Sequence, residues 1–430
     1  MRPIIRTKLP GPKSTKILTK LKRLNLGYND PYPFVQSNKG QGCYFSDLDK
    51  NLFLDFASHV ASNPLGYNHP ALVSVVKKYS DTHPIKYAGQ DFCLKEHSDL
   101  LEELVSITPK GLNSAFLVNS GAEAVENCIK VALRKQKKAK FGISFKGAFH
   151  GRTLGALSCT DSKPIQKKNF LFIPMKTIPF DETSIEKINR IVKKQESSKN
   201  VGFIIIEAIQ GEGGYNVAPK KLMTDLRSLT KKHGIPLIID EVQSGMGRTG
   251  KWWAFEHYNI KPDIFSAAKA LQVGATISSK KFSVETGTIS STWGGGHTLD
   301  LALGLKTIQL IKKNNLLKRN TKMGNYMIKR LNDIGHASIK NVRGKGLMIA
   351  FDLPSNKIKN HFIIECLQKG LVLLGCGDKG IRLVPPYVVS KEEIDVAVKI
   401  IEEATAKTVK KGFKHKGRIC NYLTCGEVYG

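Results

Sequence analysis

Two stretches of the chain decide its fold: VGFIIIEAIQGEGG at residues 201–214 and IPLIIDEV at residues 235–242. Each contains an unbroken run of apolar, mostly β-branched residues, and the segment between them has a helical period. Strands that are apolar on both faces are typical of parallel sheets covered by helices on both sides. The run FLV at 116–118 precedes another helix-like segment and repeats this rhythm. We therefore predict an α/β fold whose large domain contains a mostly parallel sheet.

Acidic residues stand where these strands end, Glu207 after the first and Asp240 after the second. In open parallel sheets, ligands bind beyond the carboxyl ends of the strands. The sequence thus predicts a binding site at this edge of the sheet.

Both ends of the chain predict a smaller α+β domain. Strand-like runs occur in GQGCYFSDLDKNLFLDF at 40–56, in NVRGKGLMIAFDLP at 341–354 and in LVLLGCGDKGIRLVPP at 371–386. The predicted boundaries are 1–70 for the N-terminal segment of the small domain, 71–320 for the large domain, 321–405 for the C-terminal part of the small domain and 406–430 for a basic tail.

The chain of 430 residues is strongly basic, with 67 Lys and Arg against 36 Asp and Glu and a net charge of +31. Such an excess suggests a nucleic-acid partner. However, residues 1–23 hold eight of the basic residues and residues 407–418 hold six, and the remainder is spread along the chain. A nucleic-acid groove interleaves aromatic residues with a local basic stripe, and the sequence has no such stripe. We expect a solvated basic surface and no nucleic-acid partner.

The sequence also bears on compartment and metal binding. Its longest apolar runs, such as 201–206 and 371–375, are far shorter than the roughly 18 residues that a membrane span requires. The N-terminus MRPIIRTKLPGPK lacks the apolar core of a secretory signal, so we expect a cytoplasmic protein without a membrane partner. Cys420 and Cys425 form a lone C-x4-C motif, which has too few ligands for a metal site. No metal is therefore expected.

One motif predicts a phosphate site. SGAEAVENCIKVALRK at 120–135 has an apolar face of helical period, and Ser120 and Glu123 form a capping box at its start. Gly121 allows close approach to the backbone, and the free N–H groups and positive dipole end of a helix N-terminus suit a phosphate. Taken alone, the motif is also compatible with a helix start that binds nothing.

A second motif, FKGAFHGRT at 145–153, is a glycine-punctuated loop. A flat ring can stack on Phe149, and the planar guanidinium of Arg152 suits a carboxylate. Taken alone, this segment is also compatible with an ordinary loop.

A stronger signal combines IIIEAIQGEGG, IIDEVQSGMGRTG and PDIFSAAKALQVG, which place Asp240, Gln243 and Lys269 after strand-like runs. A lysine in apolar surroundings loses its proton readily and becomes a nucleophile toward aldehydes. An Asp that faces a pyridine nitrogen keeps that nitrogen protonated, so that the ring accepts electrons. The alternative for Lys269 alone is a surface lysine that reaches into solvent.

Together with NSGAEAVENCIKVA, GAFHGRT and STWGGG, these motifs resemble the class III aminotransferases, the pyridoxal-phosphate enzymes that include 4-aminobutyrate, acetylornithine and lysine 6-aminotransferases. The resemblance runs from about residue 35 to about residue 402. It implies a fold-type I pyridoxal-phosphate transferase whose cofactor is pyridoxal 5'-phosphate.

The resemblance implies roles for the cofactor-binding residues. Lys269 matches the lysine that binds the cofactor covalently, Asp240 the partner of the pyridine nitrogen and Gln243 the partner of the phenolic oxygen. The other matching residues are Phe149, which stacks on the ring, Ser120, Gly121 and Ala122 at the phosphate, and Thr292, which reaches the phosphate of the other subunit's cofactor. A homodimer with shared active sites is therefore implied.

The resemblance also implies how two small-molecule substrates are bound. Arg152 matches the arginine for the far carboxylate of an ω-amino acid, and Arg382 matches the arginine for the α-carboxylate of 2-oxoglutarate or glutamate. Glu212 matches a residue that pairs with Arg382 while the ω-amine reacts and swings away in the second half-reaction. Val60 stands where the family lines the substrate entrance.

The implied activity is transfer of the ω-amino group of 4-aminobutyrate to 2-oxoglutarate, which gives a semialdehyde and glutamate. Gln272 and Val273, with STWGGG at 291–296, favour lysine 6-aminotransferases and animal-type 4-aminobutyrate enzymes over acetylornithine enzymes. The alternatives left open are a lysine 6-aminotransferase, an acetylornithine or ornithine aminotransferase, a class III-type amino-acid racemase, and a basic nucleic-acid-binding protein that has kept the fold.

Overall fold

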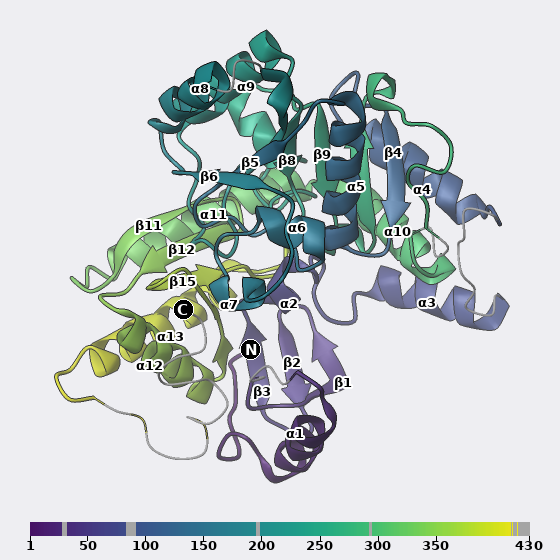
Figure 1. Ribbon diagram of the computed structural model, residues 1–430. Coiled ribbons are helices and arrows are strands. Elements are labelled where there is room, and N and C mark those ends of the chain that lie inside the picture. Colours follow the sequence, from purple (N-terminus) through teal and green to yellow (C-terminus); the bar gives the residue numbers. More distant parts are fainter. Residues whose placement is uncertain are drawn as a thin grey trace. The chain divides into compact units, whose positions relative to one another are not determined.

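The computed structural model describes residues 1–27, 32–82, 92–194, 198–291, 295–413, 415 and 419. The chain divides into two compact units, which Figure 1 shows in sequence colours. The first unit is formed by Met1–His69 and Arg319–Gly430, and the second unit by Pro70–Lys318. The first unit therefore combines segments from both ends of the chain.

The second unit contains a seven-stranded sheet in the order β4-β10-β9-β8-β7-β5-β6. Its strands are β4 (Ser114–Val118), β5 (Phe141–Phe145), β6 (Met175–Ile178), β7 (Val201–Glu207), β8 (Leu237–Asp240), β9 (Ile264–Ala267) and β10 (Gly274–Ser278). Strands β6, β5, β7, β8 and β9 pair in parallel, and β10 runs antiparallel to both β9 and β4. Every residue of β7 and β8 is buried. The prediction of a mostly parallel sheet with apolar strands is confirmed.

Helices connect the strands of this unit. They are α3 (Pro70–Thr82), α4 (Lys95–Ser106), α5 (Gly121–Lys135), α6 (Leu154–Cys159), α7 (Pro164–Lys167), α8 (Ser184–Lys194), α9 (Lys220–His233) and α10 (Thr298–Lys313), with short 3-10 turns at Ser198–Asn200, Ala254–Tyr258, Lys269–Leu271 and Lys280–Phe282. Helix α11 (Leu316–Asp333) runs from this unit into the first.

Helix α5 is held on the sheet by its apolar face. It packs against β9 and β10, and Figure 1 shows it beside β9. One buried cluster joins Val125, Cys128 and Ile129 of the helix with Phe203 of β7 and Ile264 of β9. Burying such side chains contributes about 1.5–3 kcal/mol each, so this packing fixes where the helix begins relative to the strand ends.

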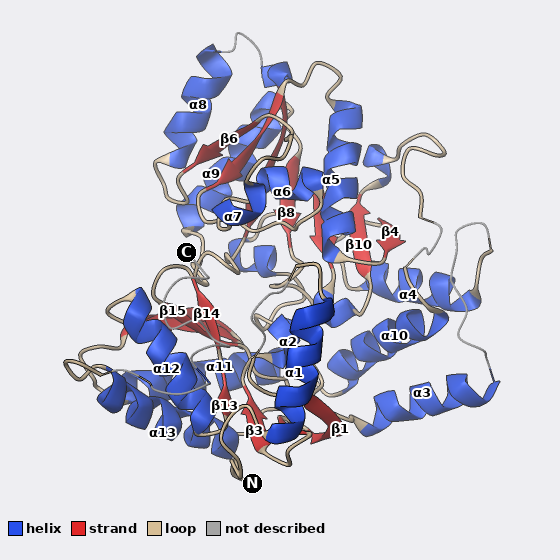
Figure 2. Ribbon diagram, turned by 60° about the horizontal axis from the view of Figure 1, so that its bottom comes forward, coloured by secondary structure: helices blue, strands red, loops and turns tan. Residues whose placement is uncertain are grey.

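The first unit is built from two four-stranded sheets, whose strands and helices Figure 2 distinguishes by colour. One sheet has the order β1-β2-β3-β13 and the other β11-β12-β15-β14. The strands are β1 (Gln36–Gln41), β2 (Tyr44–Asp47), β3 (Leu52–Asp55), β11 (Lys340–Lys345), β12 (Met348–Asp352), β13 (Leu371–Val372), β14 (Leu374–Cys376) and β15 (Gly380–Leu383), and the helices are α1 (Pro12–Leu24), α2 (Ser58–Ala61), α12 (Asn356–Gln368) and α13 (Lys391–Thr408).

Strand β13 pairs in parallel with β3, so a strand near the C-terminus completes a sheet begun near the N-terminus. None of the helices in the described part of the chain has the length and apolar character that a bilayer crossing requires.

Candidate active site

The candidate residues of the second unit collect at one edge of its sheet. Glu207 and Asp240 are register partners at the ends of β7 and β8, and Asp240 is also paired with Ser266 of β9. Since β4 and β9 both run antiparallel to β10, β4 points the same way as β9. The segments that follow β4, β5, β8 and β9 therefore leave the sheet at the edge where ligands bind in such folds.

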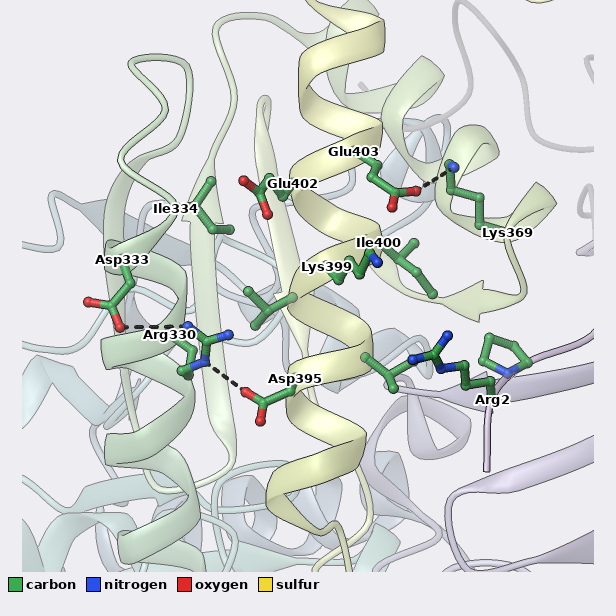
Figure 3. Close-up of a pocket in the computed structure, with 13 residues that line it drawn as sticks. Arg2, Arg330, Asp333, Ile334, Lys369, Asp395, Lys399, Ile400, Glu402 and Glu403 are labelled. Carbon is green, nitrogen blue, oxygen red and sulfur yellow. Dashed lines mark hydrogen bonds and ion pairs between the residues drawn. The ribbon is translucent and has the colours of Figure 1, made fainter.

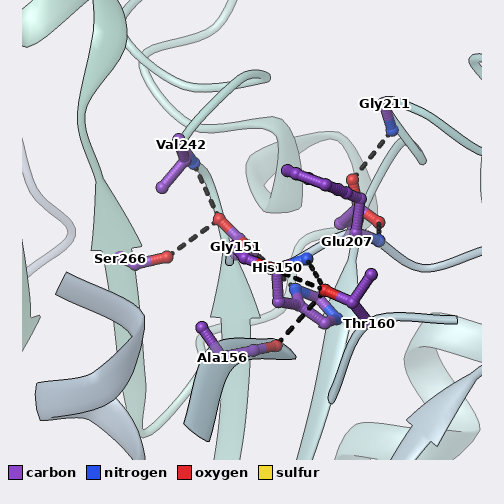
Figure 4. A network of polar contacts seen from close by, with 10 residues as sticks. His150, Gly151, Ala156, Thr160, Glu207, Gly211, Val242 and Ser266 are labelled. Atoms are coloured by element: carbon purple, nitrogen blue, oxygen red, sulfur yellow. Dashed lines mark hydrogen bonds and ion pairs between the residues drawn. The ribbon is translucent and has the colours of Figure 1, made fainter. Parts of the chain in front are cut away.

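Asp240 is a buried carboxylate held by three groups, shown in Figure 4. Its Oδ1 accepts hydrogen bonds from Val242 N at 3.0 Å and from Ser266 Oγ at 2.9 Å. His150 Nδ1 lies 2.8 Å from Asp240 Oδ2, and the ring donates to this oxygen. His150 is itself fixed, because its backbone N–H donates to Thr160 Oγ1 at 2.9 Å. The orientation of Asp240 is thus set by neighbouring strands and by the loop after β5.

The N-terminus of α5 has the predicted capping box. Ser120 Oγ accepts from Glu123 N at 3.2 Å, and Glu123 Oε2 accepts from Ser120 N at 3.0 Å. The N–H groups of Gly121 and Ala122 have no acceptor within the helix because they belong to its first turn. These N–H groups and the helix dipole make this end suitable for an anion.

Gly121 brings this helix end against the neighbouring strand ends. A Cβ at Gly121 would lie 2.7 Å from Val242 Cγ1 and 3.3 Å from Ala268 Cβ. Any larger residue would therefore push α5 away from the segments that carry Asp240 and Lys269. The glycine is required here by close packing.

Lys269 follows Ala268, the first residue after β9, and it is half-buried. Its φ of 51° lies in the left-handed region, which costs a residue with a Cβ roughly 1–2 kcal/mol. Gln272 N donates to Lys269 O at 2.9 Å and closes the turn. Strained backbone of this kind clusters at functional sites.

Gln243 has a buried partner that sequence reasoning missed. Tyr215, which is fully buried, donates its hydroxyl hydrogen to Gln243 Oε1 at 2.7 Å. A Cβ at Gly211 would lie 2.8 Å from Gln243 Nε2. The side chain of Gln243 is therefore held by the loop that follows β7.

The loop after β5 carries Phe149 and Arg152. Phe149 is half-buried and Arg152 is exposed. A Cβ at Gly151 would lie 2.9 Å from Ala122 Cβ, so this loop contacts the first turn of α5. The ring of Phe149 and the guanidinium of Arg152 thus come from a loop that borders the helix N-terminus.

Glu212 has a cationic partner within the second unit. Lys163 Nζ lies 3.4 Å from Glu212 Oε2, and both side chains are 16% exposed. Lys163 was missed by sequence reasoning. Its predicted counterpart, Arg382, is buried in β15 of the first unit, between β12 and β14. The pairing of Glu212 with Arg382 stays a prediction, and Thr292 lies outside the described residues.

Val60 lies in a strained turn of the first unit. Ser58, His59, Val60 and Ala61 all have left-handed φ values, between 46° and 71°. The buried carboxylate of Asp55 holds the start of this turn, because its Oδ1 accepts from Ala57 N at 2.8 Å and from Ser58 N at 2.9 Å. Four consecutive residues without glycine in this region are unusual.

Only part of this arrangement had a signal in the sequence. His150 stands beside Phe149 in the predicted loop, but its partner Asp240 lies 90 residues further along the chain. Tyr215 and Lys163 carry no such signal, because their partners lie 28 residues away in one case and in a different loop in the other.

The first unit has a separate surface pocket of about 710 Å³ along α13, shown in Figure 3. Several of its charged groups pair with one another. Arg330 Nε lies 2.7 Å from Asp395 Oδ1, and Lys369 Nζ lies 2.7 Å from Glu403 Oε2. The lining therefore mixes both signs of charge and lacks the single-sign character that suits an acidic substrate.

Comparisons with known proteins place this site in context. Residues 27–405 match the family Aminotransferase class-III. An acetylornithine aminotransferase of Archaeoglobus fulgidus is 34% identical over 85% of this chain and 94% of its own. The mitochondrial 4-aminobutyrate aminotransferase of Homo sapiens is 30% identical over 94% of this chain and 91% of its own. The solved structure of a lysine aminotransferase from M. tuberculosis matches with a TM-score of 0.86 at 26% identity, over 92% of this chain and 100% of that one.

These identities bear on the predicted donor class. The acetylornithine relative is more similar in sequence than the 4-aminobutyrate relative, so the identities do not support the preference against acetylornithine enzymes that was drawn from Gln272, Val273 and the segment at 291–296.

Proposed function

Since the chain belongs to the class III aminotransferases, which are pyridoxal-phosphate enzymes, we propose that it transfers the ω-amino group of a 4-aminobutyrate-like donor to 2-oxoglutarate. The products are a semialdehyde and glutamate. The observation that carries this proposal is the cluster at one sheet edge. There the N-terminus of α5 packs at Gly121 against Val242 and Ala268, in the segments that carry Asp240 and Lys269.

The residues at this edge fit the cofactor. Asp240 is a buried acceptor for the pyridine nitrogen, and His150 holds its second oxygen. The N–H groups of Gly121 and Ala122 suit the phosphate, and Lys269 supplies the amine for covalent attachment. When bound, pyridoxal phosphate supplies a ring that accepts electrons from the substrate carbon.

Lys269 has the role of a general base and acid. Its Nζ takes the proton from the carbon that bears the donor's amino group, and the same amine later returns a proton.

Two arginines are the proposed partners of the substrate carboxylates. Arg152 is the proposed partner of the donor's far carboxylate, and Arg382 that of the α-carboxylate of 2-oxoglutarate and glutamate. Glu212 is the proposed partner of Arg382 when no α-carboxylate is bound. Val60 is the proposed lining of the substrate entrance.

A second candidate donor is acetylornithine, which the 34% identity to an acetylornithine aminotransferase favours. This donor carries its own α-carboxylate, so Arg152 suits it as well. The choice between the donors depends on the shape of the entrance and on the position of Glu212.

A donor panel tests the proposal. Purified holoenzyme is given 4-aminobutyrate, lysine, ornithine or N-acetylornithine with 2-oxoglutarate, and glutamate is measured. We expect the highest kcat/KM with 4-aminobutyrate. The Lys269→Ala variant and a reaction without 2-oxoglutarate are the controls. A preference for acetylornithine supports the second candidate, whereas racemisation of an amino acid without glutamate formation refutes both.

We also propose a homodimer, in which Thr292 of each subunit reaches the partner's cofactor. Light scattering after gel filtration tests the oligomeric state, and a monomeric, active holoenzyme would contradict it. The cytoplasmic location stays a prediction.

A further inference from the structure

Two loops of the second unit carry the groups proposed to read substrate carboxylates. The β5 loop, residues 146–153, carries Arg152, and the β7 loop, residues 208–219, carries Glu212. The two loops are in direct contact. Gln210 Nε2 donates to Lys146 O at 2.6 Å, and a Cβ at Gly213 would lie 2.4 Å from Gly147 O. Arg152 and Glu212 therefore lie on two loops that pack against each other.

Glu207 joins these loops through its two carboxylate oxygens, as Figure 4 shows. Its Oε2 accepts a hydrogen bond from Phe149 N in the β5 loop at 3.0 Å. Its Oε1 accepts from Gly211 N in the β7 loop at 2.8 Å. Because each oxygen is directed at a different loop, the carboxylate constrains the backbone of both.

Glu207 must be ionised for both of its oxygens to accept, although its burial disfavours the ionised form. The residue is 6% exposed, and burial raises its pKa to about 7, with His150 opposing the rise and Asp240 adding to it. These are the titratable groups that face it from the β5 loop and from β8. In the ionised form both oxygens accept, whereas protonation gives one oxygen a hydrogen that opposes an N–H donor.

We propose that Glu207 is a positioning residue that couples the β5 and β7 loops, so that Arg152 and Glu212 are set as one unit for binding the two substrates. This inference rests on the proposed function for the roles of Arg152 and Glu212. It does not rest on the identity of the donor, since Glu207 accepts its two hydrogen bonds from the backbone N–H groups of Phe149 and Gly211.

Hydrogen exchange of the holoenzyme tests the coupling without any substrate. The Glu207→Gln variant keeps the size of the side chain but replaces one acceptor oxygen with an NH2 group. We expect exchange to become about tenfold faster in peptides from both loops, the effect of losing a hydrogen bond to a charged acceptor. The matched control is Glu241→Gln, because Glu241 is also buried and accepts from Ser244 Oγ and Phe255 N instead. Its exchange should rise near Phe255 and not in the two loops.

Kinetics provide a second readout. In Glu207→Gln the KM values for the preferred donor and for 2-oxoglutarate should both rise about tenfold, with a smaller change in kcat. In Glu241→Gln, KM/kcat should stay near the parent's value for each of the two substrates. Unchanged exchange in either loop, or an equal rise in both variants, overturns the proposal.

If Glu207→Gln does not yield soluble protein, hydrogen exchange of the parent enzyme at several pH values tests the same coupling. Exchange in the two loops, corrected for intrinsic rates, should rise together as the pH falls from 8 to 6, and independent responses overturn the coupling. Failure of the proposed function is distinguishable, because it would appear as an absence of glutamate with the parent enzyme and every donor.

Discussion

Replacing Glu207 by Gln is also expected to stabilise the protein at alkaline pH. Burial raises the pKa of this carboxyl from its ordinary value of 4.5 to about 7. A carboxyl that binds its proton more tightly in the folded protein than in the unfolded chain makes stability fall as the pH rises. The loss begins near the unfolded pKa and is complete above the folded one.

The size of the effect follows from the same values. A pKa raised from 4.5 to about 7 corresponds to roughly 3 kcal/mol, at about 1.4 kcal/mol for each pKa unit. The variant carries no such charge but leaves one backbone N–H without its acceptor, which costs about 1 kcal/mol at any pH. Because pH 5 already lies above the unfolded pKa, the parent has lost about 0.8 kcal/mol there, so Glu207→Gln should be about as stable as the parent at pH 5 and more stable by about 2 kcal/mol at pH 8.

Urea unfolding of both holoenzymes, followed by tryptophan fluorescence at pH 5, 6, 7 and 8, measures this difference. Glu241→Gln is a useful parallel, because burial raises the pKa of Glu241 to about 7 as well, and it should show the same change with pH. A difference in the free energy of unfolding between Glu207→Gln and the parent that stays constant from pH 5 to 8 would refute the reasoning. A variant more stable yet weaker in substrate binding would show that the charge is kept for positioning.

Three further predictions concern other parts of the molecule. Ser120→Ala removes the acceptor for Glu123 N, so it should lower stability by about 1 kcal/mol and weaken pyridoxal-phosphate binding. Thermal unfolding and cofactor titration measure these two effects. Ser120→Thr, which keeps the hydroxyl, should behave like the parent. Val60→Gly should raise stability by up to about 1 kcal/mol, since φ is 57° at this residue and glycine relieves the strain; Lys50→Gly, at a φ of 65° outside the turn, is the control, and a loss of stability in Val60→Gly contradicts the strain. Glu212→Ala should slow the half-reaction of the ω-amine more than that of glutamate in single-turnover absorbance measurements, and equal losses would remove the gating role.

Much of the fold could be read from local patterns. The apolar runs of β7 and β8 predicted buried parallel strands, and each is buried throughout. The capping box of Ser120 and Glu123 predicted where α5 begins. These features depend on residues a few positions apart, and a sequence displays such relations directly.

The order of the strands could not be read in this way. Strand β10 inserts between β4 and β9 in the antiparallel direction, although its sequence GATIS at 274–278 has no feature that specifies either neighbour. Strand β13 completes a sheet with β3 across more than 300 residues of chain. Such pairings depend on packing over the whole unit.

The same division holds at the candidate site. The sequence alone shows which chemical groups stand at the strand ends, since Asp240, Lys269 and the start of α5 lie at the end of a strand-like run or within a few residues of one. Their partners come from the tertiary structure: His150 contacts Asp240, Tyr215 contacts Gln243, and Glu207 contacts two loops at once. The reason is physical. A strand end fixes where a side chain leaves the sheet, but the group that completes its hydrogen bonds comes from whichever segment packs there, and that depends on non-local contacts.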